Sequence, residues 1–321
     1  MIVLTAAMSL SLVTAAPAAR PRPEVRIVKV TRSPKNPLIT PKSGKRIGRN
    51  INGPSVIRVP DWIEKPLGAY YMYFANHHGD HIRLAYANDL RGPWTVYEPG
   101  VMDLKQATGF RGHVASPDVH VDAKEKRLRM YFHGPARGGQ KTGVAFSTDG
   151  LRFEPRPAIL GPFYFRVFRW KGAHYAIAKG GGAGDGILMR SDAPDTPFTA
   201  RKGVFVPDMR HAAVLLRGNT LLLFYSRIGD APERIVLATV KLEGEWTDWT
   251  LSKPVEVIEP KAPYEGIRHP NKPSRSGSGT GVRQLRDPAV FEENGKVYLF
   301  YSFAGEEGIA LAEIELGEPE K

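Results

Sequence analysis

The chain has 321 residues, with 45 Lys and Arg against 33 Asp and Glu, 33 Gly, 27 Pro and no Cys. A hydrophobic content of 42% excludes a disordered chain. The absence of Cys excludes a disulfide scaffold, a Cys-ligated zinc site, an iron–sulfur cluster and a thiol nucleophile. The Gly and Pro content favours many turns over a helical bundle, and the net charge of +12 favours an anionic partner.

Residues 1–19 have the features of a cleaved export signal. An apolar run from Ile2 to Val13 is too short to span a bilayer, and the small residues that follow it contain an Ala-x-Ala pattern typical of a signal peptidase site. We therefore predict a secreted or periplasmic protein without a membrane span, in which residues 20–321 form one domain. The alternatives are an apolar N-terminal strand or a misassigned start codon.

The rest of the chain repeats one unit of short strands. Runs rich in Val, Ile, Phe and Tyr alternate with clusters of Gly, Pro, Asn and Asp, which indicates strands and turns. The first unit has strands predicted at 54–59, 69–74 and 82–87, with an outer strand at 94–98. In chain order, the later units have strands predicted at 117–121, 128–132 and 143–147; at 165–170, 174–178 and 186–190; at 212–216, 221–225 and 235–239; and at 288–291, 297–301 and 308–312.

Such repetition predicts an all-β, five-bladed β-propeller, with blades starting near residues 54, 117, 165, 212 and 288. Four-stranded units of roughly 40–50 residues are typical of propeller blades. The long intervals carry insertions, chiefly 99–115 and 255–286. Residues 24–30 could supply the outer strand of the last blade and so close the ring. A β-sandwich is the alternative, but it would not explain the same three strands in five successive units.

The starts of the innermost strands meet around the central channel of a propeller, so the residues just before them should converge there. These residues are Gly53, Ser116, Tyr164, His211 and Asp287, preceded by Asn52, Ala115, Phe163, Arg210 and Arg286. The set includes a carboxylate, an imidazole, a phenol and two guanidinium groups from separate blades. Enzymes use such groups for proton transfer and charge stabilisation on polar substrates.

Two motifs give the chain a resemblance to the five-bladed propeller glycoside hydrolases. These motifs are Arg-Asp-Pro-Ala-Val-Phe at 286–291 and Tyr-Phe-His-Gly at 131–134. The families concerned are the arabinanases and xylosidases (family 43), the invertase-like enzymes (family 32) and the neoagarobiose hydrolases (family 117). The resemblance covers roughly residues 45–316 and implies a glycoside hydrolase. In those relatives an Asp-Pro at an inner-strand start often carries a catalytic or stabilising Asp, a form that Asp287 matches. The first blade reads Asn52-Gly53-Pro54, without the Asp that families 43 and 32 place there, so no single family is matched.

The candidate catalytic residues are Asp287, Asp118, His211, His133 and Glu265. Asp287 or Asp118 would be the base that activates water, and Glu265, His133 or His211 would be the acid. Each also has a structural interpretation: either Asp could cap a turn, the histidines could be core residues, and Glu265 could be a solvated loop residue.

We predict no required cofactor and assign no metal ligands. The resemblance to family 43 implies that His211 could also hold a channel metal ion or a water molecule. His77, His78 and His81 form a second group of histidines, but adjacent side chains on a strand point to opposite faces, so at most two of them could share a metal. A substrate contact by His78 is the favoured interpretation of this group.

The remaining candidates for substrate binding are polar or cationic residues at or near the channel, namely Asn52, Tyr164, Arg166, Arg210, Arg286 and Arg268. Arg binds carboxylate and sulfate groups bidentately, so we expect an acidic glycan as the substrate. The alternative is that these arginines pair with Asp118 and Asp287. The basic residues form no dense stripe, so we expect no nucleic acid as a partner.

Two other functions remain open at this stage. A polysaccharide lyase would need a base such as His211 or Tyr164 and a cation to neutralise a uronate. A non-catalytic carbohydrate-binding propeller would need neither. The sequence leaves the sugar, the linkage, the stereochemical outcome and the oligomeric state open.

Overall fold

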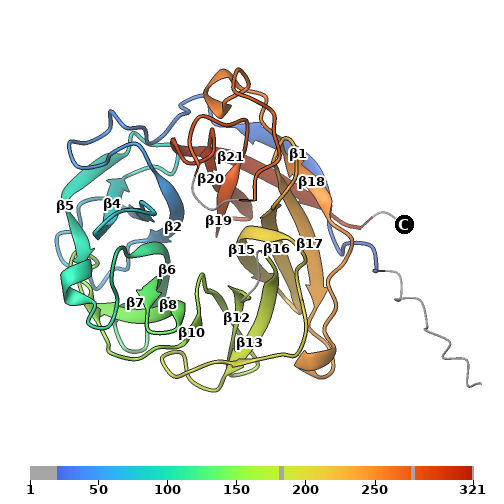
Figure 1. The fold of residues 1–321 in the computed structure, drawn as a ribbon, viewed down its shortest axis with the longest axis horizontal. Coiled ribbons are helices and arrows are strands. Elements are labelled where there is room, and N and C mark those ends of the chain that lie inside the picture. Colours follow the sequence, from blue (N-terminus) through green and yellow to red (C-terminus); the bar gives the residue numbers. More distant parts are fainter. Residues whose placement is uncertain (1–19, 181–183, 276–278, 320–321) are drawn as a thin grey trace, which may run out of the picture.

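The computed structural model describes residues 20–180, 184–275 and 279–319, so the predicted export signal at 1–19 lies outside the described residues. Within these ranges, antiparallel sheets stand around one axis as the five blades of a propeller (Figure 1). The predicted all-β, five-bladed fold is confirmed. The helices in the described ranges are 3-10 turns of three residues each, and none has the length and apolar character that crossing a membrane requires.

Each blade begins with an inner strand, and later strands lie progressively further out. Blade 1 has the order β2 (Asn52–Arg58), β3 (Tyr70–Ala75), β4 (His81–Ala87) and β5 (Thr95–Asp103). Blade 2 has β6 (Ala115–Asp122), β7 (Arg127–Ala136) and β8 (Gly139–Ser147), and the short β9 (Glu154–Pro155) and β10 (Gly161–Pro162) both pair with β8. Blade 3 has β11 (Arg166–Trp170), β12 (Ala173–Lys179), β13 (Gly186–Ser191) and β14 (Thr199–Ala200).

The last two blades follow the same plan. Blade 4 has β15 (Met209–Arg217), β16 (Thr220–Arg227), β17 (Ile235–Lys241) and β18 (Val255–Ile258). Blade 5 has β19 (Arg286–Glu293), β20 (Lys296–Phe303) and β21 (Gly308–Gly317), and its outermost strand is β1 (Arg26–Arg32) from the other end of the chain.

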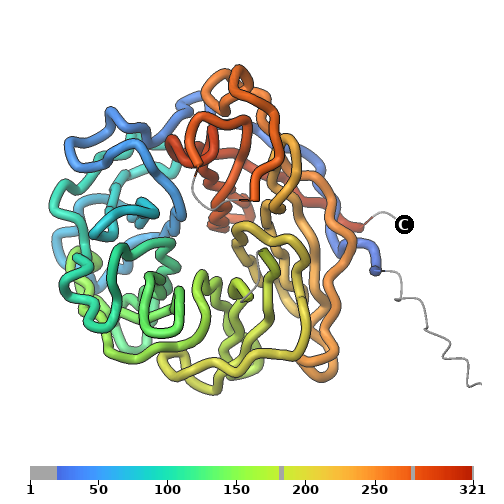
Figure 2. The backbone as a smooth tube through the Cα atoms, viewed as in Figure 1, coloured from blue at the N-terminus to red at the C-terminus, as the bar shows by residue number. Residues whose placement is uncertain are grey.

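The pairing of β1 with β21 closes the ring. The two strands are antiparallel, with Val30 opposite Ile314, and the tube in Figure 2 shows the blue N-terminal segment running beside the red C-terminal one. This confirms the predicted closure by the N-terminal segment. Because one blade contains both ends of the described chain, the ring can be complete only when the whole chain has folded.

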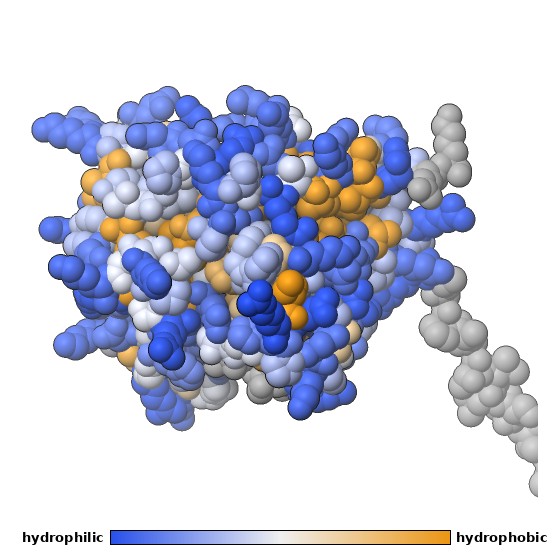
Figure 3. All heavy atoms as spheres, turned by 90° about the horizontal axis from the view of Figure 1, so that it is seen from above, coloured by the Kyte–Doolittle hydropathy of each residue, from blue (hydrophilic) through white to orange (hydrophobic). Residues whose placement is uncertain are grey.

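The core lies between the blades, and the second strand of each blade contributes most to it. All six residues of β3 are buried, and Tyr71 and Tyr73 pack with Leu128 and Phe153 between blades 1 and 2. Burial of each such side chain stabilises the fold by roughly 1.5–3 kcal/mol. Hydrophilic side chains cover most of the face shown in Figure 3, with hydrophobic atoms visible between them.

Candidate functional site

At the starts of four inner strands, one residue has a left-handed backbone. Each is a residue that the repeat predicted to converge on the channel. These residues are Gly53 (φ 59°), Ser116 (φ 46°), Tyr164 (φ 65°) and Asp287 (φ 45°). At Gly53, Ser116 and Asp287 the pairing between the inner and the second strand also shifts in register, as in a β-bulge. In blade 4 the same shift lies between Met209 and His211. A bulge re-aims the side chains beside it, and left-handed residues other than Gly cost about 1–3 kcal/mol. Strain of this kind is concentrated at functional sites, which indicates that this end of the channel is one.

The ends of the second strands lie at the same edge, because each second strand is antiparallel to its inner strand. His133 in β7 pairs with Ala115, at the start of β6. Lys179 ends β12, His77 follows β3, and Glu306 follows β20. Two sets of residues, strand starts and strand ends, therefore surround one end of the channel.

A cavity of about 360 Å³ opens at this end of the channel. Its polar lining is formed by His77, His78, His113, His133, Gln140, Tyr164, Lys179, Arg210, His211 and Arg275. The lining, as far as the chain is described, includes no Asp or Glu. Burial lowers the pKa of Lys179 to about 8, and its ammonium donates hydrogen bonds to the carbonyl oxygens of Met209 and Arg210. The cavity is thus suited to an anionic or hydroxyl-rich ligand.

Glu306 and His77 form the polar pair at the base of the cavity. The Oε2 atom of Glu306 lies 2.8 Å from Nδ1 of His77, and the same oxygen accepts hydrogen bonds from the amides of Asn50 (2.6 Å) and Asn52 (3.1 Å). Burial alone would raise the pKa of Glu306, but the charge and hydrogen bond of His77 bring it below its ordinary value. Burial alone would lower the pKa of His77, but Glu306 raises it. Asn52, a predicted substrate contact, is fully buried and supports this pair.

Asp287 and His211 form the neighbouring pair. The Oδ2 atom of Asp287 lies 3.2 Å from Nδ1 of His211, and the Asp287 side chain is fully buried. Neither carboxyl oxygen of Asp287 accepts a hydrogen bond from the described residues. Burial raises the pKa of Asp287 against the opposing charges of His77 and nearby arginines, and burial holds the pKa of His211 well below its usual range.

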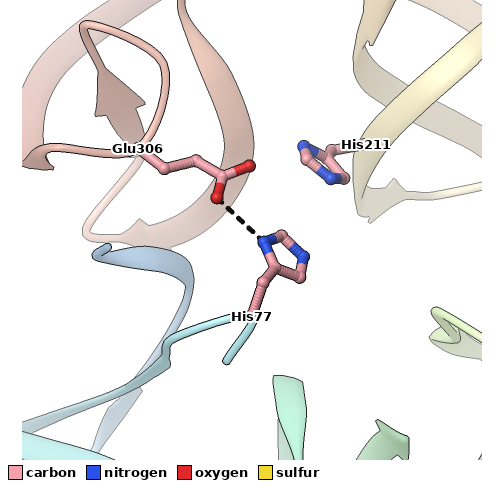
Figure 4. Close-up of side chains that lie close together, drawn as sticks. All are labelled: His77, His211 and Glu306. Atoms are coloured by element: carbon pink, nitrogen blue, oxygen red, sulfur yellow. Dashed lines mark hydrogen bonds and ion pairs between the residues drawn. The ribbon is translucent and has the colours of Figure 1, made fainter. Parts of the chain in front are cut away.

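The imidazoles of His77 and His211 face each other across this base. Their ring centroids are 6.1 Å apart with planes tilted by 20°, and Figure 4 shows both rings beside the Glu306 carboxylate. One possible ligand atom from each of His77, His211 and Glu306 lies within 4.8 Å of the other two. These three residues could therefore hold a metal ion.

Arg210 and Arg286 pair with carboxylates other than those that the sequence suggested. Nε of Arg210 lies 2.8 Å from Glu233, and Arg286 lies 3.7 Å from Glu233 and 3.3 Å from Oε1 of Glu306. Both arginines are almost fully buried, and both also donate to Ser274 in the insertion before β19. They form the charged floor under the cavity, and Arg210 lines the cavity as well.

Tyr164 and Arg166 are held by the backbone of blade 4. The hydroxyl of Tyr164 lies 3.1 Å from the amide nitrogen of Ala212, and Nε of Arg166 donates to the Ala212 carbonyl. The guanidinium of Arg166 lies over the Tyr164 ring, 4.3 Å from its centroid. Burial raises the pKa of Tyr164 further above its ordinary value, which disfavours a phenolate there.

Asp118 lies further along the channel, apart from the cluster. Its carboxylate accepts a hydrogen bond from the amide of Val167 and lies 2.9 Å from Nε2 of His120. It lines a separate, smaller cavity with Arg166. Burial would raise the pKa of Asp118, but His120 and Arg166 lower it. The structure therefore does not bring Asp118 together with Asp287.

Glu265 forms an ion pair with the N-terminal strand β1. Its carboxylate binds Arg32 of β1 at 2.7 Å, the hydroxyl of Tyr301 at 2.7 Å and the amides of Lys261 and Ala262. None of these four partners belongs to the cavity lining formed by the described residues. A carboxylate with this many donors is poorly suited to act as a general acid, and its contacts are those of a structural residue.

The other two predicted contacts lie at the surface. His78 lines the cavity and is exposed, with its backbone amide bound to Asn76. Arg268 is exposed in the loop after Glu265.

Sequence reasoning missed Glu306, Glu233, Asn50 and Lys179. Lys179 ends a second strand and Glu306 follows one, whereas Glu233 precedes the third strand β17 and Asn50 precedes β2. The comparison of the repeats considered only the residues next to the starts of inner strands. The signal that could have found Glu306 and Lys179 is the position of His133. Each of them follows the aromatic or aliphatic second strand of its blade, as His133 does.

No family model matches the chain. The chain is 35% identical over 297 residues to "Uncharacterized protein R118" of Acanthamoeba polyphaga mimivirus, and the match covers 83% of each chain. Similar solved structures include the exo-1,5-α-L-arabinanase from a bovine ruminal metagenomic library, with 14% identity, a TM-score of 0.54, and coverage of 85% of this chain and 94% of that one. The GH43_1 enzyme from Xanthomonas citri has 15% identity and a TM-score of 0.57, with coverage of 82% and 88%.

A third similar structure comes from work on the GH130 family of mannoside phosphorylases, which contains glycoside hydrolases that target β-1,2 mannosidic linkages in Candida mannan. Its identity is 12% and its TM-score 0.63, with coverage of 95% of this chain and 98% of that one. At such identities the likeness shows a shared fold. The predicted resemblance to the propeller glycoside hydrolases is confirmed at that level.

Proposed function

The chain belongs to the same family as the mimivirus protein and has the fold of the propeller glycoside hydrolases, and we propose that it is a glycoside hydrolase acting on an anionic glycan. The observation that carries the proposal is that two buried carboxylates, Glu306 and Asp287, contact two imidazoles, His77 and His211, that line one cavity. Cleavage of a glycosidic bond needs a proton donor for the leaving oxygen and a group that activates water.

Asp287 is the proposed proton donor. Its carboxyl group is fully buried and accepts no hydrogen bond from the described residues, so the neutral, protonated form is favoured. His211, which lines the cavity, lies beside it and positions its carboxyl group.

Glu306 is the proposed fixed negative charge on the side where water is activated. Asn50, Asn52 and His77 all contact its Oε2 atom, which stabilises the ionised carboxylate. This assignment differs from the sequence-based prediction, in which Asp287 or Asp118 was the base and Glu265, His133 or His211 the acid. Asp287 is now the acid, and Glu306 replaces Asp118 and Asp287 on the side of the water.

The anionic character of the substrate is supported by the lining of the cavity. Lys179, Arg210 and Arg275 line it together with histidines, and its described lining includes no carboxylate. A uronate or sulfate group on the glycan would find cationic partners there, and burial strengthens each such contact.

The lyase alternative is less well supported. Elimination needs a base near the sugar C5 proton, and the two groups considered for it were His211 and Tyr164. The Tyr164 hydroxyl is bound to the Ala212 backbone, and burial raises its pKa, so loss of its proton would be costly.

A panel of uronic-acid-containing, sulfated and neutral polysaccharides, incubated with the purified protein, tests the proposal. Each digest is measured for new reducing ends and for new ultraviolet absorbance. We expect reducing ends from an anionic member of the panel without new absorbance. New absorbance would show elimination, cleavage of neutral glycans alone would contradict the anionic substrate, and binding without products would indicate a carbohydrate-binding propeller.

A further inference from the structure

We propose that His77, His211 and Glu306 bind one divalent transition-metal ion such as Zn²⁺. One ligand atom from each residue lies within 4.8 Å of the other two, and the closest contact, Nδ1 of His77 to Oε2 of Glu306, is 2.8 Å. Ligand atoms that bind Zn²⁺ at about 2.0–2.2 Å lie roughly 3–3.5 Å from one another. Modest side-chain movement would therefore bring all three atoms to bonding distance.

The three ligands come from separate blades. His77 follows β3 of blade 1, His211 lies near the start of β15 of blade 4, and Glu306 follows β20 of blade 5 (Figure 4). The backbones that hold them are fixed by the sheets, so the site is preorganised. A site assembled from rigid elements loses little entropy when it binds an ion.

The donor set selects the class of metal. Two imidazoles and one carboxylate suit Zn²⁺ and its neighbours among the divalent transition metals, whereas Ca²⁺ and Mg²⁺ prefer oxygen ligands alone. Three protein ligands also leave a fourth position, which is typical of catalytic rather than structural zinc. His77 and His211 line the cavity, so that position would face the substrate.

The surroundings supply a second, independent argument. Asp287 is fully buried, contacts the His211 ring at Nδ1, and accepts no hydrogen bond from the described residues. A buried carboxylate without donors needs a cation or a proton nearby. The backbone N–H of Asp287 donates to Nδ1 of His211 at 3.3 Å and so orients the ring, and the amides of Asn50 and Asn52 fix the Glu306 carboxylate.

The charges around the site allow a further cation. Arg286 lies 3.3 Å from Oε1 of Glu306, but Glu233 pairs with both Arg286 and Arg210. Glu233 and Glu306 thus balance the two arginines, and Asp287, which is protonated when no ion is bound, can supply a further negative charge when a cation binds. Binding of the ion would displace the proton shared between His77 and Glu306, and solvent would take up that proton.

The role of the ion rests on the proposed function, because a bound ion would lower the pKa of a water molecule at the open position and so help to activate it. Binding itself is independent of that function. Metal bound without turnover would leave this inference standing while the proposed function fails. Turnover by protein that binds no metal would do the reverse.

The test is a calorimetric titration of the full chain with Zn²⁺ after removal of metals by a chelator. We expect one ion per chain, and we expect His77→Ala and Glu306→Gln to weaken binding by about 100-fold or more, since each removes a ligand. His78→Ala is the matched control, because it removes the adjacent histidine and should leave the affinity unchanged. Circular dichroism identifies any variant that fails to fold. We expect His77→Ala to fold, because His77 lines the cavity, whereas Glu306 is fully buried.

Two results would overturn the inference. One is a wild-type protein that takes up no Zn²⁺ in the titration. The other is a folded His77→Ala variant that binds Zn²⁺ as tightly as the wild type, which would place any ion elsewhere. In either case the contact between His77 and Glu306 would be a simple ion pair.

Discussion

The Oε2 atom of Glu306 lies 2.8 Å from Nδ1 of His77, although 229 residues separate them in the chain. Glu306 belongs to blade 5, which is completed by the N-terminal strand β1, and His77 belongs to blade 1. The pair therefore forms only when the ring has closed. The candidate site thus depends on the closure of the propeller.

Asp287→Asn should lower kcat by about 100-fold or more while the fold is retained, because the amide cannot donate the proton of a carboxylic acid. The measurement is the steady-state rate on the glycan that the panel identifies. Glu292→Gln is the matched control, since Glu292 lies near the far end of the same strand, paired with Arg217. Equal rates for Asp287→Asn and wild type would remove Asp287 from the mechanism.

The affinity for an anionic glycan should fall as the pH rises through about 8. The pKa of Lys179 is lowered to about 8, chiefly by burial and then by the charge of Arg210, against the opposing charges of Glu233, Asp287 and Asp185. Lys179 is therefore charged below this pH and neutral above it. We expect KM for the anionic substrate to rise across that range.

The variant Lys179→Gln provides the control for this pH dependence. It should show a raised KM at all pH values and no further rise near pH 8. A wild-type KM that stays constant between about pH 7 and pH 9 would contradict a role for the Lys179 charge in binding.

Glu265→Gln should reduce the free energy of unfolding by about 2–3 kcal/mol, less than for a fully buried pair because the Arg32 side chain is 26% exposed. Burial would raise the pKa of Glu265, but hydrogen bonds from Arg32 and from the Ala262 and Lys261 amides lower it. A carboxyl with a lowered pKa stabilises the fold above its ordinary pKa, near 4.3, and this contribution is lost as the pH falls below it.

Urea denaturation at neutral and acidic pH measures this contribution. The difference between wild type and Glu265→Gln should shrink as the pH falls. Glu293→Gln removes a surface pair with the exposed Arg58 and keeps an amide oxygen that can accept from the Tyr70 hydroxyl, so it should cost less than Glu265→Gln at neutral pH. A Glu265→Gln variant as stable as wild type would show that the ion pair is not structural.

Gly53→Ala should destabilise the protein more than Gly218→Ala. Both glycines have left-handed backbones, with φ of 59° and 54°, so each substitution carries the same backbone cost of roughly 1–2 kcal/mol. At Gly53 an added Cβ would also lie 2.9 Å from the Cα of Ser116, whereas at Gly218 nothing lies within 4 Å. Blades 1 and 2 would have to separate at the channel, so turnover should fall only in Gly53→Ala.

Urea denaturation and the rate assay, applied to both glycine variants, measure these effects. Losses of equal size at the two positions would mean that the close approach of Gly53 to Ser116 is not required.

The architecture could be predicted from the sequence because each blade repeats the same local signals. Residues such as Tyr71 and Tyr73 belong to a second strand whose apolar character recurs in every unit, and the buried core confirms that pattern. The convergence of Asp287, His211 and Tyr164 also followed from the repeat, since topology alone places strand starts at one edge.

The partners of these residues could not be predicted in the same way. Glu306 and Glu233 lie in loops, and only the packed structure shows that they pair with Arg286 and Arg210. Glu265 lies in the insertion before the inner strand of blade 5, and this position in the sequence suggested a place near the channel. In the structure, the pairing of β1 with β21 brings Arg32 to its carboxylate. Such contacts depend on ring closure, which no local pattern specifies.

The most direct test of the central claim is digestion of the anionic glycan in water enriched in oxygen-18, with the products measured by mass spectrometry. A glycoside hydrolase transfers one oxygen atom from water to the anomeric carbon of each new reducing end, and the glycosidic oxygen stays on the other fragment. We predict that each product reducing end carries one oxygen-18 atom with wild-type protein and that Asp287→Asn gives almost no product. Unsaturated products that lack oxygen-18, or no products from any glycan, would contradict the account.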